Sequence, residues 1–148
     1  MDVKEYYSKK GLPDFAMVAS EFDLSSIEGE NFARKIAEKL IEKIEKYRHL
    51  LEEFLHADGN SFSVLMEMRE MTEVEKEEVS ALYQELVVIE RSFLAADLDA
   101  KEEALLEFIK RTLLQWNALK PRLKVFALKI RDSWKNLKKG QEELGYLG

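Results

Sequence analysis

Apolar residues recur at alternating spacings of four and three along most of the chain, which is the pattern of amphipathic helices. The first long stretch follows Ser25 and Glu28, whose separation of three residues is a capping-box pattern that predicts the start of a helix. Asp58 and Gly59 predict its end, because glycine readily adopts the left-handed conformation that terminates helices. The apolar face of this predicted helix comprises Ala33, Ala37, Leu40, Ile44, Tyr47, Leu51 and Phe54.

A second helical stretch extends from Phe62 to about Ala96. Its apolar face weakens towards its beginning, where Thr72 and Glu75 form another capping-box pattern. The sequence therefore predicts either a break near Thr72 or a change of face within one long helix. The clear part of the apolar face comprises Val79, Leu82, Leu86, Ile89 and Phe93.

A third capping-box pattern, formed by Asp99 and Glu102, predicts the start of the last helix. Pro121 lies within this helix on the side opposite its apolar face, where a carbonyl that loses its hydrogen bond can bind water. We therefore expect one continuous, kinked helix that ends at Gly140. Its inner apolar face comprises Leu105, Ile109, Thr112, Trp116, Leu119, Leu123, Phe126, Ile130, Ser133 and Leu137.

Together these stretches predict an all-α fold. We expect an elongated antiparallel up-down-up bundle of three long helices, or of four helices if the second stretch breaks near Thr72. Residues 1–24 are expected to form an N-terminal arm with a short helix that opens at Pro13. The arm either lays its aromatic side chains over the bundle or becomes ordered only on a partner. The bundle domain is predicted over 25–139, followed by a flexible tail over 140–148.

The composition excludes several kinds of site. The 148 residues include no cysteine, which excludes disulfides, thiolate zinc sites, iron–sulfur clusters and cysteine nucleophiles. No apolar run approaches the roughly 18 residues that a membrane span requires, and the first ten residues lack the apolar core of a signal peptide. We therefore expect a cytoplasmic protein that does not bind a membrane.

The sequence gives only weak evidence for catalytic or metal-binding residues. The two histidines, His49 and His56, lie two helical turns apart on the outer side of the first helix, so they cannot bind one metal ion together. Acidic residues repeat with a Glu-x-x-Glu spacing within 67–78, as in helical pyrophosphohydrolases that hold magnesium, but the expected acidic motif downstream is missing. We predict no catalytic residue, no metal site and no cofactor. A magnesium-dependent all-α nucleotide hydrolase remains the second alternative.

Charge is strongly segregated along the chain, although the net charge is only −6. A bundle would place the acidic segment 67–90 beside the basic segment 110–139, so the first interpretation is internal pairing. The second is a surface for nucleic acid or another anion, formed by Lys124, Arg131, Trp134, Lys135 and Lys138. The ten basic residues of the segment are Lys110, Arg111, Lys120, Arg122, Lys124, Lys129, Arg131, Lys135, Lys138 and Lys139.

The last helix also carries a second apolar stripe, opposite its inner face. A helix that is apolar on both sides is either enclosed by its own bundle or open to another chain. Three long helices leave little room for enclosure, so we predict a surface for self-association or for a protein partner. The stripe comprises Leu114, Ala118, Pro121, Val125 and Leu128.

These features favour a non-catalytic helical-bundle interaction protein that self-associates, or docks as a subunit, through its basic last helix. The first alternative is a nucleic-acid-associated regulator that uses the segment 110–139. The two interpretations differ in which face of the last helix has to be free, because the apolar stripe serves the first and the basic surface serves the second.

Overall fold

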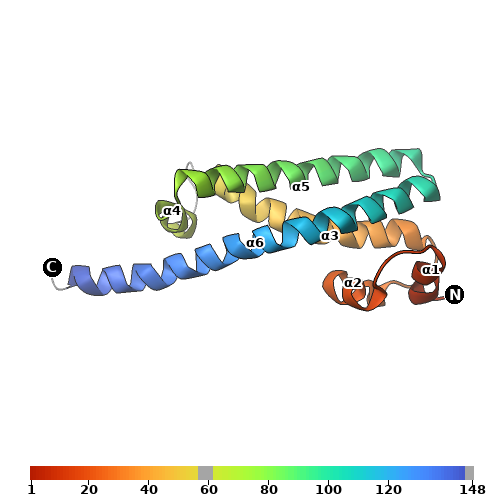
Figure 1. The fold of residues 1–148 in the computed structure, drawn as a ribbon, viewed down its shortest axis with the longest axis horizontal. Helices are drawn as coiled ribbons and strands as arrows, with labels where there is room; N and C mark the ends of the chain where they lie inside the picture. The colour runs from red at the N-terminus through yellow and green to blue at the C-terminus, as the bar shows by residue number, and fades with distance from the viewer. Residues whose placement is uncertain (57–61, 146–148) are drawn as a thin grey trace. The chain divides into compact units, whose positions relative to one another are not determined.

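The computed structural model describes residues 1–56 and 62–145, with side chains described as far as residue 135 (Figure 1). The described residues form helices and no strand, which confirms the predicted all-α fold. In chain order the elements are α1 (Val3–Lys9), α2 (Phe15–Phe22), a 3₁₀ turn (Leu24–Ser26), α3 (Phe32–Leu55), α4 (Phe62–Arg69), α5 (Glu73–Asp99) and α6 (Glu102–Gly145).

The chain forms two compact units. The first unit combines residues 1–47 with residues 86–116, and the second combines residues 48–85 with residues 117–148. The three long helices α3, α5 and α6 each contribute a segment to both units. Each unit has its own set of buried apolar side chains.

In the first unit, segments of α3, α5 and α6 pack around a common core. Phe93 of α5 and Phe108 of α6 have ring centroids 5.6 Å apart, and a short turn at Ala100 joins these two helices antiparallel (Figure 1). The ring centroid of Tyr47 in α3 lies 6.1 Å from that of Trp116 in α6. The fully buried side chains of this core include Leu40, Ile44, Leu86, Ile89 and Ile109.

The N-terminal arm supplies part of the core of the first unit. Tyr7, Phe22 and Leu24 are all buried. The Phe22 ring contacts the Trp116 ring edge to face at 5.5 Å, and Nε1 of Trp116 donates a hydrogen bond of 2.9 Å to the Glu21 carboxylate. The arm therefore shields the indole of Trp116 from solvent on the side where these residues lie.

The start of α3 differs from the prediction. The helix begins at Phe32 rather than at Ser25, because Leu24–Ser26 form a 3₁₀ turn instead of the first turn of an α-helix. Gly29 and Asn31 follow with φ angles of 88° and 61°, in the left-handed region, so the chain cannot be helical between the turn and Phe32. The capping-box interpretation of this segment is wrong.

Two further helix starts are corrected. α2 begins two residues after Pro13, and Asp14 between them adopts a left-handed conformation with φ 51°, so the proline lies outside the helix. α6 begins at Glu102 rather than directly after Asp99, because Ala100 adopts φ 53°. The predicted capping box at Asp99 is therefore wrong, since its residues are separated by a residue that cannot belong to a helix.

The second unit contains the break predicted near Thr72. The backbone N–H of Glu75 donates to Oγ1 of Thr72 at 3.1 Å, and the backbone N–H of Thr72 donates to the Glu75 carboxylate at 3.0 Å. This reciprocal capping box confirms the start of α5. Across the core, the rings of Phe54 in α3 and Phe126 in α6 lie 5.0 Å apart. The other buried side chains of this unit include Leu51, Val64, Val79, Leu82, Leu119 and Leu123.

α6 is one continuous helix through Pro121, as predicted. It does not end at Gly140 but continues to Gly145, so much of the expected tail over 140–148 has a helical backbone. The predicted end of the first long helix at Asp58 and Gly59 lies outside the described residues.

Candidate interaction surface

The inner face of α6 belongs to the cores of both units. Thr112 and Trp116 are buried in the first unit, and Leu119, Leu123 and Phe126 are buried in the second. These positions follow the spacings of three and four that the sequence showed. The predicted inner face is therefore confirmed from Leu105 to Phe126, whereas Ile130 is only half-buried and the side chain of Leu137 lies outside the described residues. Because the helix has a fixed period, the buried face also determines which residues of α6 point away from the core.

All five residues of the predicted second stripe are exposed. Leu114, in the first unit, retains 72% of its surface. In the second unit, Val125 retains 69% and Leu128 retains 38%, and Ala118 and Pro121 are also exposed. No described element of the chain encloses this face. A row of exposed apolar side chains along one helix is typical of a surface that another protein covers.

Pro121 lies on the exposed side of α6, where the loss of a helical hydrogen bond costs the least free energy. Proline has no backbone N–H, so the carbonyl of Asn117, four residues earlier, loses its helical hydrogen bond. Both residues are exposed, and water can therefore satisfy that carbonyl. The stripe thus combines apolar side chains with one backbone acceptor, the carbonyl of Asn117, that makes no hydrogen bond to the residue four positions later.

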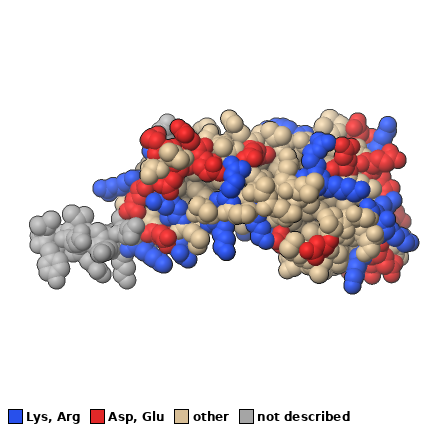
Figure 2. All heavy atoms as spheres, in the orientation of Figure 1, with Lys and Arg blue, Asp and Glu red and all other residues tan. Residues whose placement is uncertain are grey.

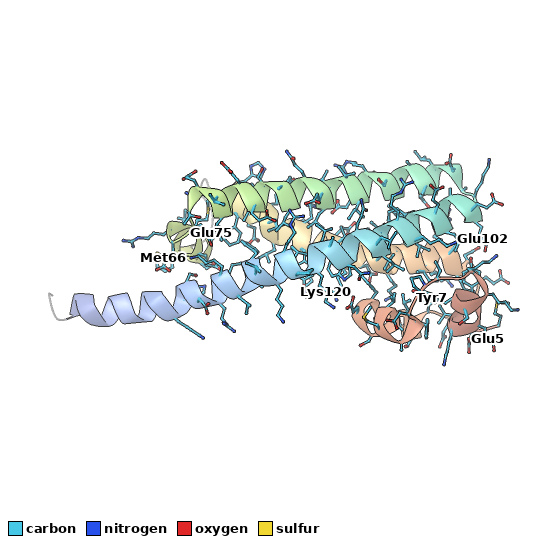
Figure 3. All side chains as sticks on the ribbon, in the orientation of Figure 1. Glu5, Tyr7, Met66, Glu75, Glu102 and Lys120 are labelled. Atoms are coloured by element: carbon cyan, nitrogen blue, oxygen red, sulfur yellow. The ribbon has the colours of Figure 1, made fainter. Side chains whose placement is uncertain are left out.

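Part of the basic charge of α6 is neutralised by α5, as the internal-pairing interpretation expects. Within the second unit, Arg122 donates hydrogen bonds of 2.6 Å to both Glu78 and Glu85. Lys129 lies 3.6 Å from the carboxylate of Glu75, which Figure 3 labels near the start of α5. Figure 2 shows acidic side chains over the start of α5 and basic side chains along the adjacent part of α6. The hydrogen bond to Glu78 is the main reason that the pKa of Arg122 is raised.

Another part of the basic charge faces solvent. Lys124, Arg131 and Lys135 are exposed, and the last two contact Asp132 on their own helix at 3.0 and 3.8 Å. Such exposed pairs contribute little to stability. The side chain of Lys138 lies outside the described residues. The predicted basic surface is thus accessible at three of its four basic residues.

Trp134 has a partner that sequence reasoning missed. Its indole N–H donates a hydrogen bond to Glu67, a buried carboxylate on α4, although the side chain of Trp134 is still 39% exposed. Burial raises the pKa of Glu67, the hydrogen bond from Trp134 lowers it, and the nearby Glu53 raises it further, with a net increase. The sequence placed Glu67 only in an acidic run, and the apolar residues around it were the one sign that it could be buried.

The candidate metal ligands are not brought together. In the described parts of the chain, no group of three or more histidine, aspartate or glutamate side chains could hold a metal ion. Glu75 and Glu78 are engaged by Lys129 and Arg122 instead, and the backbone hydrogen bond from Thr72 is the largest reason that the pKa of Glu75 is lowered.

A cavity of about 470 Å³ lies in the first unit, between the arm, the start of α3 and the start of α6. The two charged residues at its wall, Arg34 and Glu102, each form an ion pair with a neighbouring residue. Glu102, labelled in Figure 3, accepts a hydrogen bond from the hydroxyl of Tyr6 and lies 3.1 Å from Nζ of Lys10. Nε of Arg34 lies 3.1 Å from Asp97. The hydrogen bond from Tyr6 is the largest cause of the lowered pKa of Glu102. This cavity therefore offers structural ion pairs rather than reactive groups.

No helix in the described residues is long and apolar enough to cross a membrane. No protein-family model matches the sequence, and no curated protein or solved structure matches it either. The exposed face of α6 is therefore the feature on which a functional proposal can rest.

Proposed function

We propose that this chain is a non-catalytic helical interaction protein that associates with copies of itself through the outer face of α6. The exposure of Leu114, Ala118, Pro121, Val125 and Leu128 along one continuous helix carries this proposal. Removing a leucine or valine side chain from water contributes about 1.5–3 kcal/mol, so burying this row against another chain is strongly favourable.

The proposal is tested by measuring the mass of the purified chain by size-exclusion chromatography with light scattering. We expect the wild type to have a mass above the 17.3 kDa of one chain. Leu128→Asp and Ala118→Asp should shift the mass to that of a monomer, because each places a charge in the middle of the stripe.

Ala127→Asp is the matched control, since Ala127 is also an exposed alanine of α6 but lies off the stripe. This variant should retain the mass of the wild type. A wild type that is a monomer at every concentration, with no change in Leu128→Asp, would contradict the proposal.

The second candidate is binding of nucleic acid, and the exposure of Lys124, Arg131 and Lys135 favours it. It is the weaker candidate because Arg122 and Lys129 are paired with acidic residues of α5. It predicts an affinity for duplex DNA or RNA that falls steeply with salt and with charge reversal at Arg131 and Lys135, measured by fluorescence anisotropy. Absent or salt-insensitive binding removes this candidate.

A further inference from the structure

We infer that the second copy lies antiparallel on α6, with Pro121 of each chain meeting at a two-fold axis. This inference rests on the proposed function and specifies which residues of the two copies face each other. It follows from the residues that continue the exposed stripe beyond its apolar part. Those residues carry charges whose order reverses about Pro121.

In the first unit, the outer face of α6 continues towards the beginning of the helix with Lys110 and Glu107. They precede Leu114 by four and seven residues, so they lie on the same side of the helix. Both are exposed. The sequence of this half of the face, read from Pro121 outwards, is therefore alanine, leucine, lysine, glutamate.

In the second unit, the outer face continues beyond Leu128 with Asp132 and Lys135. They follow Leu128 by four and seven residues, and their side chains are half exposed or more. The sequence of this half, read from Pro121 outwards, is valine, leucine, aspartate, lysine. Each half presents two apolar residues nearest Pro121 and two charges of opposite sign further out.

The two halves are complementary when the α6 helices of two copies lie antiparallel, so that one half of the first copy faces the other half of the second. Leu114 lies seven residues before Pro121 and Leu128 seven residues after it, so they form a matching pair in an antiparallel arrangement. In the same register, Lys110 of one copy faces Asp132 of the other. Residues at equal distances from a two-fold axis share a layer of an antiparallel helix pair, as self-complementary interfaces require.

One further layer has the same complementarity. Glu107 lies fourteen residues before Pro121 and Lys135 lies fourteen residues after it, so a glutamate of one copy faces a lysine of the other. A parallel arrangement would instead place each of Lys110, Glu107 and Lys135 against its own copy. Like charges facing each other are unfavourable, so the charge pattern selects the antiparallel orientation.

The ion pairs that Glu107 and Asp132 already form within α6 do not prevent the proposed antiparallel pairing. Glu107 accepts a hydrogen bond of 2.8 Å from Arg111 on its own helix, and Asp132 lies 3.0 Å from Arg131 and 3.8 Å from Lys135. All three are exposed pairs within one helix, which contribute little to stability. Each proposed layer pairs a residue of α6 in one copy with the residue of α6 at the equal sequence distance beyond Pro121 in the other copy.

Disulfide cross-linking tests the orientation, because the wild-type chain contains no cysteine and every disulfide must therefore join two introduced cysteines. Pro121→Cys should give a covalent dimer on oxidation, since the two copies of this residue meet at the axis. Leu114→Cys alone should not, because its two copies lie roughly 21 Å apart at a rise of about 1.5 Å per residue. Leu114→Cys combined with Leu128→Cys should again give a covalent dimer.

Charge exchange tests the register. Glu107→Lys alone and Lys135→Glu alone should each raise the dissociation constant about tenfold, because each creates two facing pairs of like charge in the dimer. The two substitutions together restore opposite charges, and should return the constant to that of the wild type. Glu77→Lys, at an exposed position of α5, is the matched control and should leave it unchanged.

The outcomes separate this inference from the proposed function. A monomeric wild type overturns both. A dimer that Leu128→Asp dissociates, but that cross-links through Leu114→Cys alone, supports self-association through the stripe and overturns the antiparallel orientation. A dimer that cross-links through Pro121→Cys, but that the combined charge exchange does not restore, overturns the register of the charged layers.

Discussion

At the scale of single residues, Glu67 is the least expected side chain of the protein. It is a buried carboxylate held by the indole N–H of Trp134, with the charge of Glu53 nearby. Burial disfavours the ionised form, and this effect outweighs the hydrogen bond, so the pKa lies above its ordinary value of 4.5. The folded protein therefore binds the proton of Glu67 more tightly than the unfolded chain does.

This pKa predicts how Glu67 affects stability at different pH values. A group whose pKa is raised on folding contributes stability that is present below its unfolded pKa and is lost as the pH rises through its folded pKa. Glu67→Gln keeps an acceptor for Trp134 but carries no charge. The variant should therefore be more stable than the wild type at pH 7.5 and closer to it at pH 4.

Urea denaturation at the two pH values measures this difference. Glu77→Gln serves as the control, because Glu77 is exposed and its substitution should leave the free energy of unfolding nearly unchanged at both. An advantage of Glu67→Gln that is the same at pH 4 and pH 7.5 would show that ionisation of Glu67 is not its cause.

At the scale of elements, the start of α5 depends on one local motif. The hydroxyl of Thr72 and the carboxylate of Glu75 satisfy backbone N–H groups that have no partner within the helix. Thr72→Ala should lower the free energy of unfolding by about 1 kcal/mol, the usual effect of losing such a cap. Thr72→Ser keeps the hydroxyl and should remain close to the wild type in the same urea titration, whereas equal losses in both variants would argue against the cap.

The N-terminal arm depends on packing rather than on a local motif. Phe22 is buried against Trp116, so Phe22→Ala should destabilise the protein by about 3–5 kcal/mol. The same substitution at the exposed Phe62 should change stability by less than about 0.5 kcal/mol. Thermal unfolding followed by circular dichroism compares the two. Similar effects of the two substitutions would mean that the arm does not stabilise the first unit.

At the scale of the whole molecule, two compact units share three continuous helices. α3 passes from one unit to the other at residues 47 and 48, α5 at 85 and 86, and α6 at 116 and 117. Unfolding one unit would therefore leave three helices frayed at the boundary. We expect both units to unfold in one cooperative transition.

Each unit carries its own fluorescent reporter for this prediction, Trp116 in the first and Trp134 in the second. In Trp134→Phe, fluorescence reports the first unit alone, and in Trp116→Phe it reports the second. In each variant, the urea midpoint by fluorescence should coincide with the midpoint by circular dichroism. Separate midpoints would show that the units unfold independently.

The repeating apolar pattern correctly predicted the all-α class and most of the buried face of the last helix. Leu119, Leu123 and Phe126 are buried where the spacings of three and four placed them, and Leu114 and Val125 are exposed on the opposite side. This success has a direct cause. The period of the α-helix is fixed by backbone geometry, so a sequence that repeats with that period already determines which face is buried.

Helix starts were predicted less well, although three of the four rested on the same capping-box motif. The cap at Thr72 is formed, whereas the one expected at Ser25 is not, because Leu24 and Ile27 are buried and hold the chain in a 3₁₀ turn. A capping motif requires only a few local hydrogen bonds, and burial of apolar residues nearby can outweigh it. The sequence alone could not show which of the two would prevail.

The sequence by itself therefore determined the helical class, the inner face of each long helix and the stripe of α6 that remains outside. The tertiary structure decided which carboxylates pair with lysine or arginine side chains and which are buried. Glu78 accepts from Arg122, while Glu67, in the same acidic run, is buried against Trp134. Periodicity is a property of neighbours along one helix, but the partner of a charge comes from another helix, and only packing between helices brings the two together.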